Sequence, residues 1–376
     1  MIQLVAILAV FSLGVVFSLI GAVKIKLAQK LGIDDAKVGG LISTLMFTSI
    51  FVVLFIGPLV DAWGHKPFAI LGFLLCGVAI FMLGMARSYG SAVVACVLLG
   101  VGGMCVNTVG NTLLSIVLFE GKNAPAALNL GNMFFGLGAF MTPFLAIFLV
   151  NRIGLLKTVS IIALVVLVGI IFAFPAGYPE LSAGGFDLGL AFGLLGNPIV
   201  LVAALALFCY VGLEASMGGW ITTFLTSIGV SENKASGLLS AFWISVMISR
   251  LISSAKVTPD NGAMVVTALA AVAAIAIFVM SATKSTGLAG VAVVVTGLMF
   301  GPIFPSIVGV TFTNVAQELQ GSAFAIIFAV GLLGATILPA WMGVLSKGKS
   351  IQKSMAVAGV FAIVLTVISV VMGKIG

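Results

Sequence analysis

The chain is a succession of long apolar runs separated by short polar breaks. About twelve runs are centred near residues 14, 48, 77, 104, 137, 165, 211, 243, 272, 300, 333 and 363. A helix that crosses a membrane needs roughly 20 apolar residues, and its backbone groups must bond one another because hydrocarbon offers no partners. The pattern therefore predicts an all-α membrane protein with twelve transmembrane helices.

The pattern of the first half returns in the second. Residues 31–40 read LGIDDAKVGG and residues 228–237 read IGVSENKASG, an offset of 197 residues. Residues 138–143, GAFMTP, return as residues 334–339, GATILP. Such duplication is typical of secondary transporters, whose substrate site lies between the repeats. We expect two pseudo-symmetric six-helix bundles at residues 1–175 and 198–376, joined by a cytoplasmic linker at 176–197 that is rich in Gly and Pro.

Composition supports the membrane interpretation and argues against several other classes. The chain is 62% hydrophobic and 7% charged, against about 25% charged residues in soluble domains. Its net charge of +7 is scattered between the runs, so no nucleic-acid partner is expected. The four cysteines lie inside apolar runs and His65 is the only histidine, which predicts no metal site, no cofactor and no enzyme. The expected partners are the lipid bilayer, a small solute and a coupling cation, with the chain acting as a monomer.

Buried amides and indoles are the candidate substrate ligands. Asn107 and Asn111 share one helical face, and Asn129 and Asn132 share another. Asparagine both donates and accepts, which suits the hydroxyls of a sugar. The alternative is hydrogen bonding between helices. Two tryptophans, Trp220 and Trp243, are candidates for stacking on a sugar ring, with membrane-interface anchoring as the alternative.

Ionisable residues inside the runs are few. Glu214 lies mid-span among apolar residues. A carboxylate there is costly and marks a functional site, so we expect it to carry a coupled proton. Coordination of Na⁺ and a fixed salt bridge remain alternatives. Arg250 is expected to face lipid headgroups or to cap its helix. Lys24, near the outer end of the first span, is a candidate ligand for an anionic substrate, with a side chain that only reaches toward the interface as the alternative.

The break after the second run reads GPLVDAWGHK at residues 57–66. It resembles the G-x-L-a-D-x-x-G-x-K signature of the major facilitator superfamily, in its usual position between spans two and three. We expect Asp61 to face the N-terminus of a neighbouring helix, where a carboxylate is favoured by about 0.3–1 kcal/mol. Gly57, Asp61, Gly64 and Lys66 would then form a conformational latch. The equivalent stretch of the second half, residues 254–263, lacks the motif.

Further motifs resemble the fucose/galactose/glucose–proton symporter branch of that superfamily and related bacterial sugar transporters. They are CVNTVGN at 105–111, LNLGNMF at 128–134, YVGLE at 210–214 with GGW at 218–220, and GLMFGPIFP at 297–305. The resemblance implies sugar transport by alternating access with H⁺ or Na⁺ coupling. It departs at two coupling carboxylates of the branch, which correspond to Asn107 and Lys24 here. An uncoupled facilitator, or an exporter of another small organic solute, including an anionic one, therefore remains the alternative.

Orientation is contested by two signals. The family motif is cytoplasmic, which predicts a multi-pass protein of the bacterial inner membrane with both termini in the cytoplasm. That orientation puts five of the 17 basic residues on the inner side and the other twelve outside, against the positive-inside rule. We follow the motif. The five are Lys66, Lys122, Arg250, Lys256 and Lys374.

Overall fold

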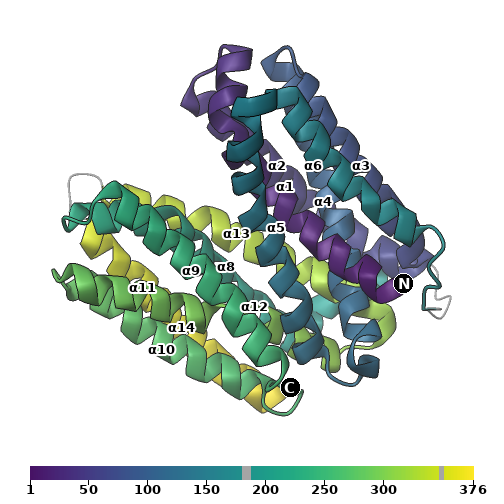
Figure 1. Ribbon diagram of the computed structural model, residues 1–376. Helices are drawn as coiled ribbons and strands as arrows, with labels where there is room; N and C mark the ends of the chain where they lie inside the picture. Colours follow the sequence, from purple (N-terminus) through teal and green to yellow (C-terminus); the bar gives the residue numbers. More distant parts are fainter. Residues whose placement is uncertain (180–187, 347–350) are drawn as a thin grey trace. The chain divides into compact units, whose positions relative to one another are not determined.

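In the computed structural model, residues 1–179, 188–346 and 351–376 are described, and every regular element among them is a helix (Figure 1). The α-helices are α1 (Ile2–Leu31), α2 (Asp35–Trp63), α3 (His65–Met85), α4 (Tyr89–Val117), α5 (Ala124–Ile153), α6 (Leu155–Ala173), α7 (Leu188–Gly193), α8 (Pro198–Ser227), α9 (Glu232–Ser254), α10 (Gly262–Ala282), α11 (Thr286–Phe300), α12 (Ile303–Thr313), α13 (Gln320–Ser346) and α14 (Ile351–Ile375). Three short 3₁₀ turns are η1 (Phe119–Gly121), η2 (Leu194–Gly196) and η3 (Gln317–Leu319).

Twelve helical segments in the described part of the chain are long and apolar enough to cross a membrane. They coincide with the twelve apolar runs, so the predicted all-α membrane fold is confirmed. The tenth segment, Thr286–Thr313, is divided into α11 and α12. The chain is an integral, multi-pass membrane protein.

The polar breaks between the runs are short turns with defined helix caps. Gly32 ends α1 in the left-handed conformation at φ 62°, where a residue without Cβ is favoured. The Asp34 carboxylate then caps α2 by accepting the Lys37 amide at 2.9 Å. Ser88 and Ser91 form a reciprocal capping box at the start of α4. These caps end one helix and begin the next within a few residues, which keeps the turns between spans short.

The helices form two compact units. Unit 1 comprises residues 1–121, 134–191 and 316–325, and unit 2 comprises residues 122–133, 192–315 and 326–376. The first residues of α5 thus belong to unit 2 and the first residues of α13 to unit 1. The bundles at 1–175 and 198–376 stay a sequence prediction, and residues 180–187 of the expected linker lie outside the described residues.

In unit 1, α4 packs against α1, α2 and α3, and α3 also packs against α6. Glycine allows a close crossing between α1 and α5. A Cβ on Gly14 would overlap the carbonyl of Phe135, and a Cβ on Gly138 would overlap the carbonyl of Phe11. Small residues let helix backbones approach in this way in membranes.

In unit 2, α14 lies between α8 and α10, α10 packs against α11, and α11 packs against α9. The corresponding crossing joins α8 and α13: a Cβ on Gly334 would overlap the carbonyl of Phe208, and one on Gly212 would lie 2.9 Å from the Gly334 carbonyl oxygen. Gly138 and Gly334 open the duplicated GA-x-x-x-P stretch. The repeat therefore preserves a packing contact with the first helix of each half.

Large apolar side chains remain exposed along the outer helices. Examples are Leu164 at 63% and Ile171 at 68% on α6, and Ile275 at 65% on α10. Exposure of this extent over whole helices would be unfavourable in water and is expected of a surface that faces lipid.

Candidate functional site

Glu214 lies in the middle of α8 and is paired with a cation. Its Oε1 is 3.3 Å from Nη2 of Arg250 on α9. The Tyr210 hydroxyl, one turn earlier on α8, lies 2.8 Å from the same oxygen. The side chain of Arg250 is 3% exposed and that of Glu214 is 16% exposed. All three residues belong to unit 2, and the carboxylate is the most accessible part of a nearly buried ion pair.

Arg250 contradicts one prediction made from the sequence. It was expected to face headgroups or cap its helix, but it is 2% exposed and bonded on three sides. Besides Glu214, it donates from Nε to the Gly301 carbonyl at 2.8 Å and from Nη1 to the Asn132 carbonyl at 2.9 Å. A guanidinium has five donors in a fixed fork, so one arginine can hold three elements. The sequence did carry a signal for this ion pair, because Arg250 is a second ionisable residue within a predicted membrane span.

One of the two carbonyls that Arg250 reaches, that of Gly301, lies between α11 and α12, where the tenth span is divided. Pro302 and Pro305 lack an amide N–H, so the carbonyls of Leu298 and Gly301 lose their usual helical donors. The helix is interrupted between Phe300 and Ile303 for this reason. Tyr210 also lies at this point, with its hydroxyl 2.8 Å from the Phe300 carbonyl oxygen.

The amides predicted to bind substrate fall in both units. In unit 2, Asn129 is fully buried, and its Nδ2 donates to the Pro125 carbonyl at 2.8 Å and to the Ser306 hydroxyl at 3.2 Å. Its Oδ1 has no hydrogen-bond partner among the described residues. Asn132 is 4% exposed, and its Nδ2 donates to the Leu128 carbonyl at 3.0 Å. Ser306, on α12, was not anticipated from the sequence.

In unit 1, α4 carries Asn107 and Asn111, both fully buried. Asn111 Nδ2 donates to the side-chain oxygen of Asn107 at 2.9 Å and to its carbonyl at 3.0 Å. The Nδ2 group of Asn107 has no hydrogen-bond partner in the part of the chain that the structure describes. Lys24 lies on α1 with its side chain exposed. Asn107 and Asn129 thus each present one unpaired polar atom, which is costly unless something binds it.

The two tryptophans of the prediction lie in unit 2. Trp220 on α8 donates from Nε1 to the Pro339 carbonyl at 3.3 Å. Trp243 on α9 meets the ring of Phe242 edge-on, and a Cβ on Gly218 would lie 3.0 Å from the Trp243 ring. Gly218 therefore leaves room for that indole. Both tryptophans are half-buried.

The motif at residues 57–66 lies against the first turn of α13, within unit 1. Asp61 Oδ1 accepts the Gly321 amide at 2.8 Å, and Oδ2 accepts the Ser322 amide at 2.7 Å and its hydroxyl at 2.6 Å. A Cβ on Gly57 would overlap the Gly321 carbonyl, so glycine is what allows the two backbones to meet. The carboxylate thus satisfies amides that a helix N-terminus leaves free.

The remaining residues of the proposed latch, Gly64 and Lys66, have other local environments. Gly64 links α2 to α3 at φ 80°, a conformation that favours glycine. The ammonium group of Lys66 lies 5.6 Å from the centroid of the Phe174 ring. His65, given no role by sequence, is 2% exposed and lies 3.1 Å from the Thr112 hydroxyl, tying α3 to α4.

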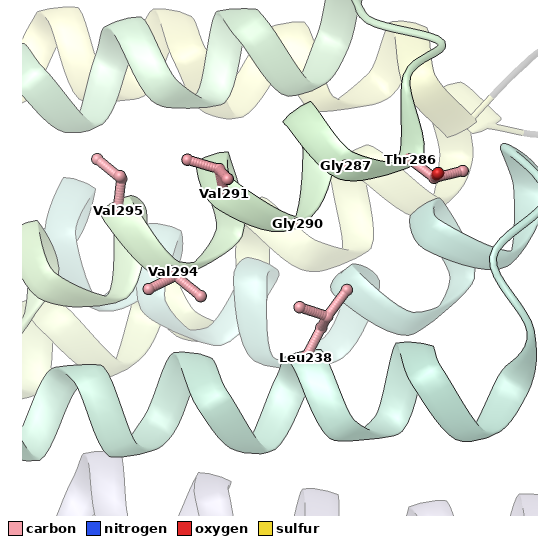
Figure 2. A pocket seen from close by; sticks show the side chains of 7 residues that line it. All are labelled: Leu238, Thr286, Gly287, Gly290, Val291, Val294 and Val295. Carbon is pink, nitrogen blue, oxygen red and sulfur yellow. The ribbon is translucent and has the colours of Figure 1, made fainter.

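A groove of about 480 Å³ on unit 2 lies between α9 and α11 and is lined by Leu238, Thr286, Gly287, Gly290, Val291, Val294 and Val295. Figure 2 shows the Thr286 hydroxyl, which is the only side-chain oxygen among these residues. A lining with a single hydroxyl and otherwise apolar side chains is a poor match for the hydroxyls of a sugar. Among the described residues, no cluster of three His, Cys, Asp or Glu could hold a metal.

Comparisons with known proteins agree with this architecture. The chain is 27% identical over 345 residues to a glucose/galactose transporter of Brucella abortus, covering 83% of this chain and 80% of that protein. It is 28% identical over 213 residues to the protein TsgA of Escherichia coli O157:H7, covering 56% and 54%.

Two solved structures share the fold over 98% of both chains. The fucose:proton symporter FucP of E. coli superposes with a TM-score of 0.84 at 17% identity, and the human organic anion transporter MFSD10 with a TM-score of 0.71 at 14% identity. The Major Facilitator Superfamily model matches residues 5–339. With twelve membrane-spanning segments, a duplicated sequence and a family match over most of its length, the chain belongs to the Major Facilitator Superfamily.

Proposed function

We propose that this protein is a secondary active transporter that moves a sugar by alternating access and couples this movement to H⁺ or Na⁺ through Glu214. The observation that carries the proposal is the buried Glu214–Arg250 pair in α8 and α9. A buried ion pair is weak evidence for stability, because desolvation can exceed the Coulombic gain. Its presence inside a membrane span is therefore best explained by function.

The substrate class is supported by amides and by a relative. Asn107, Asn111, Asn129 and Asn132 offer donors and acceptors in buried positions, and one polar atom of Asn107 and one of Asn129 have no partner. A polyhydroxylated ligand would supply these partners. The Brucella abortus relative is named for two hexoses. Trp220 and Trp243 are the proposed stacking surfaces.

Cycling of the transporter is assigned to the Asp61 contact. We propose that its bonds to the first turn of α13 stabilise one conformation and break in the other. We further propose that the protein acts as a monomer in a bacterial inner membrane, with both termini cytoplasmic. An impermeant thiol reagent applied to intact cells should then label a cysteine at position 152 and not at 66; the reverse pattern would overturn this orientation.

An uncoupled carrier of an anionic organic solute is the second candidate. The loss of two carboxylates favours it. Lys24 exposes a cation on α1 where the sugar-symporter branch has a carboxylate, and Asn107 stands where that branch has a second carboxylate. Neither residue can carry a coupled proton in the manner of that branch. This candidate predicts binding of sugar acids in preference to neutral sugars.

Uptake by proteoliposomes of defined orientation separates the candidates. The proposal predicts saturable uptake of a neutral hexose that accumulates when a proton or sodium gradient is imposed. A panel of neutral sugars and sugar acids, first screened by thermal shift because ligands stabilise the state they bind, supplies the substrates. Equilibration without accumulation would favour the uncoupled carrier, and no saturable uptake of any of these solutes would contradict both.

A further inference from the structure

The division of the tenth span is held by the two side chains that also hold Glu214. The Gly301 carbonyl has no helical donor because Pro305 lacks an N–H, and Arg250 Nε supplies one at 2.8 Å. The neighbouring Phe300 carbonyl oxygen lies 2.8 Å from the Tyr210 hydroxyl. Tyr210 and Arg250 therefore connect one carboxylate to two successive carbonyls between α11 and α12.

Tyr210 and Arg250 each have more than one hydrogen-bond acceptor within reach. Tyr210 has one hydroxyl proton and two acceptors, Glu214 Oε1 and the Phe300 carbonyl, both at 2.8 Å. It can donate to only one of them at a time. Arg250 has the Asn132 and Gly301 carbonyls besides the carboxylate. When Glu214 is neutralised, neither partner is left without a hydrogen-bond acceptor, but the buried guanidinium of Arg250 loses its counter-ion, which is costly.

In the described parts of α9 and of α11 to α14, the other charged residues lie near helix ends. Helices α11, α12 and α13 contain no Asp, Glu, Lys, Arg or His. On α9, the other charged residues, Glu232 and Lys234, are in its first turn, and the basic residues of α14 are Lys353 and Lys374 near its ends. Cys209, next to Tyr210, is a buried free thiol. Within the described residues, a charge change at Glu214 therefore acts through Arg250 and Tyr210.

We propose that Tyr210 and Arg250 are positioning residues that transmit the protonation of Glu214 to the α11–α12 division. This inference rests on the proposed role of Glu214 in coupling. One proton from the medium binds the carboxylate and no O–H or N–H bond of either partner breaks. Tyr210 then donates to Phe300 alone, and Arg250 bonds only the Asn132 and Gly301 carbonyls. The change alters the angle between α11 and α12, within unit 2.

Spin labels on either side of the division measure this angle. Val291→Cys on α11 and Thr313→Cys on α12 place them at exposed positions, after the four buried cysteines are replaced by alanine. The wild-type background should show a shift in the distance distribution between alkaline and acidic pH. Glu214→Gln should show the acidic distribution at every pH.

Tyr210→Phe is the decisive variant. It keeps the ring that meets Phe300 edge-on at 5.7 Å and removes only the hydroxyl. It should lose most of the pH-dependent shift while binding of substrate stays within about threefold, since the hydroxyl does not belong to the proposed sugar ligands. Tyr178→Phe is the matched control, because Tyr178 follows α6 in unit 1 and its hydroxyl donates to the Ala173 carbonyl at the end of that helix. Arg250→Lys keeps the charge but not the fork, and should weaken the shift.

The outcomes separate this inference from the proposed function. A pH shift of wild-type size in Tyr210→Phe would overturn the relay, and so would a wild type whose distances ignore pH. A shift present in the wild type, absent in Tyr210→Phe and fixed in Glu214→Gln supports the relay even if proteoliposomes show no gradient-driven sugar uptake. In that case only the proposed function fails.

Discussion

The first turns of α13 and α5 occupy corresponding places in the duplicated sequence, and they are held by different chemistry. Asp61, a carboxylate from another helix, accepts two amides and a hydroxyl at the start of α13. Asn123, which directly precedes α5, accepts the Ala126 amide at 3.1 Å and donates to the Val257 carbonyl at 3.0 Å. Each contact is internal to one unit.

The two contacts differ in the charge of the capping side chain and in whether that side chain comes from another helix. A carboxylate at a helix N-terminus gains from the macrodipole, and hydrogen bonds to charged groups are worth about 1.5–3 kcal/mol against about 1 for neutral ones. Asn123 caps its own helix with a neutral amide, and its link to Val257 is a single bond. Duplication thus preserved the position of the contact, while only one copy kept the charge. We infer that the α13 contact is the stronger and the more switchable.

Removing the charge at Asp61 should have the largest effect. Asp61→Asn keeps the shape, but its Nδ2 group is a donor and cannot accept from the donors of α13, so we expect the balance of outward- and inward-open states to shift by about tenfold or more. Spin-label distances between one site in each unit measure this balance. Asp260→Asn, an exposed carboxylate of the second half, is the control. Equal populations in Asp61→Asn and wild type would remove the latch from the account.

A steric clash introduced at the first turn of α5 should have an intermediate effect. A Cβ on Gly309 of α12 would overlap Pro125 in the first turn of α5. Overpacking of this kind costs about 1–3 kcal/mol. Gly309→Ala should therefore lower the thermal unfolding midpoint measured in detergent, whereas Gly287→Ala, with open space around its Cβ, should not. A stable Gly309→Ala protein would show that the α5 turn moves aside freely.

Loss of the Asn123 bridge should matter less. Asn123→Ser keeps a capping oxygen for α5 and deletes the donor to Val257. We expect a destabilisation of about 1 kcal/mol or less and a smaller shift in conformer populations than in Asp61→Asn. Chemical denaturation and the same spin-label pair test this order. If Asn123→Ser shifted the populations more than Asp61→Asn, charge would not be what distinguishes the two contacts.

Lys66 should contribute least, although it belongs to the sequence motif. Its ammonium group faces the Phe174 ring and not Asp61. An exposed cation–π contact is worth about 0.5–1 kcal/mol, so Lys66→Gln should change transport rates by less than about fivefold. Initial-rate uptake assays decide this. A loss as large as that of Asp61→Asn would show that Lys66 takes part in the latch after all.

Much of the fold could be predicted because hydrocarbon admits few structures. Apolar runs of fixed length become helices, and the GPIFP stretch divides the tenth span because proline lacks a donor. The approach of Asp61 to a helix N-terminus followed from charge and a motif. The partner of Glu214 did not follow, because Arg250 is 36 residues away and only the packing of α8 on α9 brings them together. The first turns of α5 and α13 each belong to the unit that holds most of the other half of the chain, and this assignment also depends on tertiary packing.

Reconstitution into proteoliposomes shows directly whether Glu214 carries the coupled charge. Wild-type and Glu214→Gln proteins are reconstituted side by side, and both gradient-driven accumulation and exchange between equal sugar pools are measured. Glutamine keeps the shape and hydrogen bonding of Glu214 but cannot ionise. The account predicts that exchange persists while accumulation is abolished. Full accumulation by Glu214→Gln would contradict it and favour the uncoupled carrier.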